Sequence, residues 1–236
     1  MFKIANPRQF QKITEFIYPI VNVLAFILFT IGMYFSFFAS PPDYLQGQTV
    51  RIMYIHVPSA WLSLGIYSLM AVCSFISIIW KHTLADIIAR SAAPIGATFT
   101  MVTLITGSIW GKPTWGTWWV WDARLTSELI LFFIYCGHML ISNSFDDTRK
   151  GDRAASILTL IGIINLPVIK WSVDWWNTLH QPASISKFSS PNIDIQMLTP
   201  LSFMTFAFIL FFLSILITRI RGEIYLRKIE VIKLSS

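Results

Sequence analysis

The stretch Trp110–Leu125 reads WGKPTWGTWWVWDARL, and the rest of the chain is arranged around it. Five tryptophans stand in its first twelve residues. Tryptophan combines a large apolar ring with one N–H donor, so a dense cluster is typical of a boundary between an apolar and an aqueous region. An apolar run lies on each side, over 91–109 and 125–142. We therefore predict that the cluster lies at a membrane surface, between two membrane-spanning helices.

The composition is typical of a membrane protein. Of the 236 residues, 55% are apolar and 13% are charged, whereas soluble domains carry about 25% charged residues. A helix needs roughly 20 apolar residues to cross a bilayer. We predict an all-α, polytopic protein with one membrane domain over 1–236 and an outward tryptophan-rich loop over 111–124. The six spans are expected at about 18–38, 57–80, 91–110, 125–143, 154–169 and 199–218.

The basic residues that give the net charge of +6 lie at the ends of apolar runs. This placement indicates membrane topology, and it argues against a nucleic-acid partner. The larger basic set falls on the side that holds both termini, so both termini are expected to be cytoplasmic. Loops over about 39–56, 111–124 and 170–198 then face outward. Cys73 and Cys136 lie in apolar runs without a C-x-x-C pattern, which disfavours disulfide or zinc chemistry.

The tryptophans are distributed unevenly between the two predicted membrane faces. Trp171, Trp175 and Trp176 also fall on the outward side, whereas Trp80 alone is expected at the inner face. An aromatic belt populates both interfaces, so membrane anchoring by itself explains this distribution poorly.

Two of the four histidines, His56 and His180, stand on outward segments on either side of the tryptophan loop. Each stands two positions before a proline, Pro58 or Pro182, which favours a non-helical bend at both histidines. Imidazole is a common axial ligand of haem iron, so the pair could form a six-coordinate site. The alternative of two independent surface histidines stays open on this pattern alone.

A haem site also needs aromatic walls and cations that face the propionates. The candidates for the walls are Trp115, Trp118, Trp119 and Trp121. Arg51 and Arg124 are candidates for the propionates, because a planar guanidinium pairs well with a carboxylate. Asp122 could orient Arg124 or a tryptophan N–H.

The run 115–126, WGTWWVWDARLT, resembles the tryptophan-rich motif WGxxWxWDxRLT of cytochrome c assembly proteins, and every fixed position matches. With its length, six predicted spans and two flanking histidines, the whole chain is similar to the haem exporter protein C family, the cytochrome c maturation protein C family. The related haem lyase subunits are far longer and have more spans.

This resemblance implies that two outward histidines, at the positions of His56 and His180, ligate haem b. It implies a haem-handling scaffold that holds haem at the outer membrane face and presents it for covalent loading; an enzyme that itself transfers haem covalently stays open beside this interpretation. The implied partners are the periplasmic haem chaperone (cytochrome c maturation protein E), the ATP-binding cassette transporter subunits A and B, and the small single-span protein D. The implied location is the bacterial cell inner membrane or its mitochondrial counterpart.

Two other classes of function stay open. A transmembrane transporter of haem or another solute needs polar groups along its path, and only His138 and Asn165 stand out. A docking subunit without a cofactor would use the outward aromatic surface alone. By itself, His138 is expected to be a neutral hydrogen-bonding residue between helices. Segment 143–153, which mixes charges of both signs, is expected to be a solvated turn.

Overall fold

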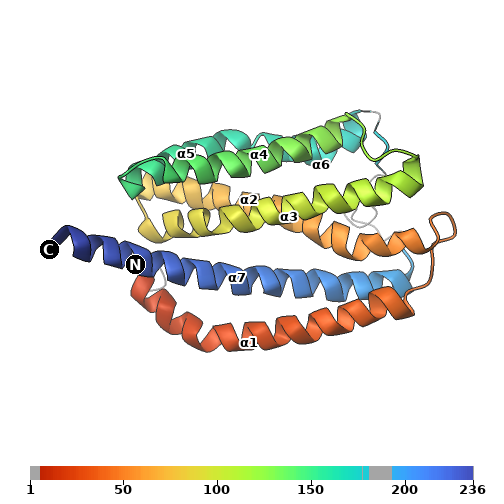
Figure 1. Cartoon of the computed structure of the whole chain (residues 1–236), viewed down its shortest axis with the longest axis horizontal. Coiled ribbons are helices and arrows are strands. Elements are labelled where there is room, and N and C mark those ends of the chain that lie inside the picture. Colours follow the sequence, from red (N-terminus) through yellow and green to blue (C-terminus); the bar gives the residue numbers. More distant parts are fainter. Residues whose placement is uncertain (1–5, 177, 181–192, 236) are drawn as a thin grey trace.

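The computed structural model describes residues 6–176, 178–180 and 193–235, which form long helices packed side by side (Figure 1). The helices are α1 (Pro7–Tyr34), α2 (Met53–Trp80), α3 (Thr83–Trp115), α4 (Ala123–Asn143), α5 (Thr148–Gly162), α6 (Asn165–Trp175) and α7 (Ile195–Ser235). A π-helical turn, η2 (Phe35–Ala39), extends α1, and a 3-10 turn, η3 (Gln48–Ile52), precedes α2. Six helical segments are long and apolar enough to cross a membrane, with α5 and α6 together forming one of them. The prediction of an all-α protein with six spans is confirmed.

The helices α2 and α3 lie in the middle of the molecule, with α1 and α7 on one side and α4, α5 and α6 on the other (Figure 1). Both ends of the described chain lie at one end of this bundle, together with the α2–α3 and α4–α5 turns (Figure 1). The α3–α4 loop lies at the opposite end. We call the end with the α3–α4 loop the tryptophan end and the other the terminal end.

The tryptophan loop is shorter than predicted, because α3 continues to Trp115 and leaves only 116–122 between the helices. Gly116 ends α3 in a left-handed conformation, with φ of 79°, which glycine adopts at little cost. Asp122 starts α4, because its Oδ1 accepts the Leu125 backbone N–H at 2.8 Å. The fixed glycine and aspartate of the motif therefore set the two boundaries of the loop.

The expected bend at His56 is wrong. The turn η3 leads directly into α2, so His56 lies in the first turns of a helix that already begins at Met53. Pro58 removes one backbone N–H, but the helix tolerates this loss close to its start. His180 does lie in a non-helical bend, as expected.

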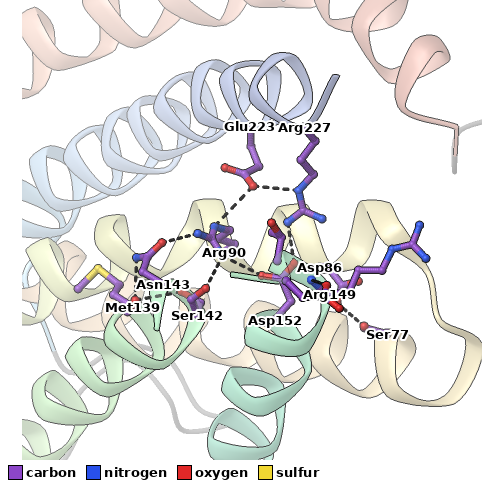
Figure 2. Close-up of polar contacts among 12 residues, drawn as sticks. Ser77, Asp86, Arg90, Met139, Ser142, Asn143, Arg149, Asp152, Glu223 and Arg227 are labelled. Atoms are coloured by element: carbon purple, nitrogen blue, oxygen red, sulfur yellow. Dashed lines mark hydrogen bonds and ion pairs between the residues drawn. The ribbon is translucent and has the colours of Figure 1, made fainter. Parts of the chain in front are cut away.

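At the terminal end, charged side chains from α3, α5 and α7 form a partly buried network around Asp152 (Figure 2). Asp152 is 4% exposed and accepts from Arg90 at 3.1 Å and from Arg227 at 2.7 Å. Glu223 pairs with the same two arginines, at 3.5 and 2.9 Å. The expectation of a solvated turn over 143–153 is therefore wrong for Asp152, because α5 begins at Thr148 and turns this carboxylate inward.

Polar side chains inside the bundle join the helices pairwise. His138 is 2% exposed and its Nδ1 lies 2.8 Å from Thr159 Oγ1, which confirms its role as a hydrogen-bonding residue between α4 and α5. Asn165 donates to the Ser127 carbonyl oxygen at 2.8 Å and so ties α6 to α4. Glu128, which the pattern did not single out, is buried and accepts from the Ser63 hydroxyl at 2.8 Å.

Candidate functional site

The His56 side chain projects from α2 onto α3 at the tryptophan end. Its Nδ1 lies 3.0 Å from Thr106 Oγ1, and its ring meets Trp110 edge-on with the centroids 5.6 Å apart. A Cβ atom added at Gly107 would lie 3.0 Å from His56 Cε1. The ring is therefore held between a hydroxyl, an indole and a helix surface that lacks a side chain.

The His180 ring packs against Trp115, with the centroids 4.9 Å apart. Its Nδ1 is buried and has no hydrogen-bond partner among the described residues. Burial, together with the nearby positive charge of Arg124, lowers the pKa of His180 to about 4. The imidazole is therefore neutral at pH 7, which is the state that a metal ligand requires.

Arg124 lies near both histidines. His56 and His180 lie close enough for their charges to interact, and the Arg124 charge acts on both. Arg124 Nη1 donates to the Ile169 carbonyl oxygen at 2.6 Å, which fixes the guanidinium between α4 and α6. The structure thus brings together two histidines from distant parts of the sequence and one cation.

The tryptophan loop lines a small pocket beside this group. The lining residues are Gly107, Trp115, Thr117, Trp118, Trp119, Val120, Asp122, Leu125 and Leu179. Trp119 Nε1 and Asp122 Oδ2 are buried without a hydrogen-bond partner among the described residues. The cavity volume of about 10 Å³ is far below the roughly 300–1,000 Å³ of typical ligand pockets. A porphyrin does not fit inside this pocket as it stands.

The chemistry of this donor set fits haem. Two neutral imidazoles suit iron, indole rings suit an apolar macrocycle, and a guanidinium suits a carboxylate. The buried polar atoms of Trp119, Asp122 and His180 are also free to bond with a bound group.

The remaining predicted site residues differ in exposure and in hydrogen-bond partners. Trp118 and Trp121 are 56% and 76% exposed. The Arg51 guanidinium donates to backbone carbonyl oxygens of Phe37 and Ser40, and so holds the end of η2 against η3. Asp122 caps α4 and does not bond Arg124. A propionate role for either arginine stays a prediction.

Sequence reasoning missed three residues that shape the site: Thr106, Gly107 and Trp110. Trp110 Nε1 donates to Gln46 Oε1 at 2.7 Å and so ties the loop before η3 to α3. Thr106 stands one helical turn before Trp110, on the same face of α3. A search one turn back from the first tryptophan of the cluster could have found it.

The family model described as Heme exporter protein C matches residues 1–235. The chain belongs to the Heme exporter protein C family. Its relatives include the Heme exporter protein C of Bradyrhizobium diazoefficiens, 48% identical over 99% of this chain and 89% of the relative. The Escherichia coli K12 protein of the same name is 45% identical over 96% of this chain and 91% of its own length.

A mitochondrial relative extends the comparison. A cytochrome c biosynthesis ccmC-like mitochondrial protein of Marchantia polymorpha is 50% identical over 80% of this chain and 79% of its own length. The Heme exporter protein C family handles haem for cytochrome c maturation, and this chain is a membrane protein with that role.

Proposed function

We propose that this chain binds haem b at its tryptophan end, with His56 and His180 as the two axial ligands of the iron. The observation that carries the proposal is the convergence of these two imidazoles, together with Arg124, in a member of a haem-handling family. The neutral state of His180 and its unpartnered Nδ1 support it further.

The other site residues hold and orient the ligand. Trp115 and Trp119 line the macrocycle, and Arg124 faces a propionate. Arg51 is the less direct candidate for the second propionate, because backbone carbonyls already accept from its Nη1 and Nη2, and only Nε is without a partner among the described residues. The bound haem supplies the vinyl group for covalent attachment, and the chain supplies binding and orientation.

The exposed aromatic residues form the surface that presents haem to a periplasmic haem chaperone. Trp118 and Trp121 project from the loop, and Trp171, Trp175 and Trp176 are about half exposed. We define these five as the aromatic rim. Partly exposed tryptophans are suited to transient protein contacts. The tryptophan end then faces the periplasm of a bacterial inner membrane, and subunits A and B of the transporter and protein D are further partners.

Optical spectra of purified wild type and histidine variants test the ligand assignment. Wild type is expected to give a low-spin haem spectrum, which His56→Ala and His180→Ala disturb singly and abolish together. His82→Asn is the matched control, because His82 lies in the α2–α3 turn at the terminal end, where asparagine preserves its N-cap. An unchanged haem content and spectrum in the double variant would show that the assignment is wrong.

The same preparation separates the alternative functions. A docking subunit without a cofactor predicts purified wild type with no Soret band. A transporter predicts haem flux into vesicles that contain this subunit alone, and flux that survives loss of both histidines would favour it.

A further inference from the structure

The Thr106 hydroxyl has three polar neighbours: two carbonyl oxygens of the preceding turn of α3, of which Thr103 is the more distant at 3.3 Å, and the His56 ring. It lies 2.6 Å from the Val102 carbonyl oxygen in the preceding turn of α3, and 3.0 Å from His56 Nδ1. A carbonyl oxygen only accepts hydrogen bonds, and a hydroxyl has a single hydrogen to donate. If that hydrogen goes to Val102, the oxygen lone pairs of Thr106 face His56.

We infer that Thr106 is a positioning residue that accepts the Nδ1 proton of His56 and thereby leaves the free lone pair on Nε2. This arrangement makes two hydrogen bonds, whereas the reverse, with the hydroxyl donating to Nδ1, makes one and gives up the bond to Val102. A neutral imidazole has one protonated nitrogen, so the partner at Nδ1 decides which nitrogen can bind a metal. That Nε2 binds iron rests on the proposed function.

Gly107 supports the same arrangement from the neighbouring position. The Cε1 atom, which lies between the two ring nitrogens, is held 3.0 Å from where a Gly107 Cβ would be. The Cε1–Nδ1 edge of the ring therefore packs against α3, with Nδ1 beside the Thr106 hydroxyl. A 180° flip of the ring would put Cδ2 in place of Nδ1 and so lose the contact with the hydroxyl.

The inference makes the two proposed ligands unequal. His56 has a hydrogen-bond partner at Nδ1, whereas His180 Nδ1 has none among the described residues. A partner at the distal nitrogen raises the basicity of an imidazole ligand and fixes its orientation. We therefore expect His56 to be the more tightly bound ligand and His180 to dissociate from the iron first when haem leaves.

The tautomer can be measured without haem. In the haem-free full-length protein, labelled with ¹⁵N-histidine in lipid nanodiscs, His56 should show a protonated Nδ1 and an unprotonated Nε2. The His56→Gln spectrum assigns the signals. Thr106→Val, which keeps the shape but removes the hydroxyl, should shift His56 toward the other tautomer, and Thr106→Ser should not. A protonated Nε2 in wild type, or an unchanged pattern in Thr106→Val, overturns the inference.

Haem titration of the same proteins tests the consequence for binding. Loss of an outer hydrogen-bond partner of a metal-bound histidine typically weakens binding roughly 10–100-fold, so Thr106→Val should raise the Kd for haem by about that factor. Thr106→Ser should stay close to wild type. If His56→Ala loses haem while Thr106→Val keeps the wild-type tautomer and Kd, the positioning role fails and the proposed ligand stands. If His56→Ala binds haem like wild type, the proposed function fails, and the nitrogen signals still decide the tautomer.

Discussion

The two ends of the bundle differ in how far their buried charged and aromatic polar groups are paired. At the terminal end, the Asp152 carboxylate pairs with Arg90 and Arg227, and Glu223 completes the network (Figure 2). At the tryptophan end, polar atoms of Trp119, Asp122 and His180 are buried without partners among the described residues.

This difference indicates that the terminal end stabilises the fold and that the tryptophan end is suited to binding a ligand. A buried polar group without a partner costs about 1–3 kcal/mol, so an end that keeps several of them gives up stability. A ligand that bonds them would recover that loss. We therefore expect substitutions at the terminal end to change mainly the free energy of unfolding, and those at the tryptophan end to change mainly haem binding.

The largest expected effect on stability is that of Asp152→Ala. The substitution removes the buried carboxylate and leaves the partly buried Arg90 and Arg227 with Glu223 alone, and loss of hydrogen bonds to charged groups costs about 1.5–3 kcal/mol. The free energy of unfolding in lipid should fall by that amount, while the haem spectrum of the folded fraction stays that of wild type.

The matched control for this substitution is Asp146→Ala, since Asp146 is exposed in the nearby α4–α5 turn. Its free energy of unfolding should change by less than about 0.5 kcal/mol. An equal loss in both variants would mean that the network does not hold the terminal end together.

A smaller effect on stability is expected for Asp122→Ala, which removes the N-cap of α4. Loss of such a cap costs about 1 kcal/mol. Asp122→Asn keeps a capping oxygen and should retain wild-type stability, so it separates the cap from the charge. If haem affinity falls in both variants, the carboxylate itself contributes to the site; if it falls only in Asp122→Ala, the cap alone is responsible.

The sequence predicted the helical architecture and the position of the tryptophan loop because these depend on local composition. Runs of apolar residues set the six spans, and the Trp-Gly…Trp-Asp pattern marked the loop that Gly116 and Asp122 delimit. It also placed His56 and His180 in segments that the fold brings close together.

The sequence did not predict features that depend on which helix faces meet. In the sequence, Thr106 and Gly107 are ordinary residues of an apolar span. Their importance comes from the packing of α2 on α3, which brings the His56 side chain into contact with both. Asp152 is one of several charges in a polar segment, and only its position on the inner face of α5 makes it buried. The prediction of a bend at His56 was wrong because the residues before it form a helical turn that continues into α2.

Gly107→Ala tests the tryptophan end with little change in stability. The new methyl group would lie 3.0 Å from His56 Cε1, so the ring must shift by a few tenths of an ångström. The gain in helix propensity, about 1 kcal/mol, offsets the crowding, and the free energy of unfolding should change by less than that. Haem affinity should fall about 10-fold, by analogy with outer contacts of metal-bound histidines.

The control for this substitution is Gly65→Ala, because nothing lies within 4 Å of its added Cβ on α2. Its haem affinity should equal that of wild type. Wild-type haem affinity in Gly107→Ala as well would mean that the position of the His56 ring on α3 is not critical.

Trp121→Ala should have the smallest effect on the free energy of unfolding, less than about 0.5 kcal/mol, because the side chain is 76% exposed. If the aromatic rim is the docking surface, the same substitution should weaken binding of the purified haem chaperone by about 2 kcal/mol or more, roughly 30-fold. Trp80→Ala is the matched control, since Trp80 is 63% exposed at the opposite end of the bundle. Chaperone binding that falls equally in both variants would reflect a general loss of surface aromatics, whereas a loss confined to Trp121→Ala assigns recognition to the end whose buried polar atoms lack partners.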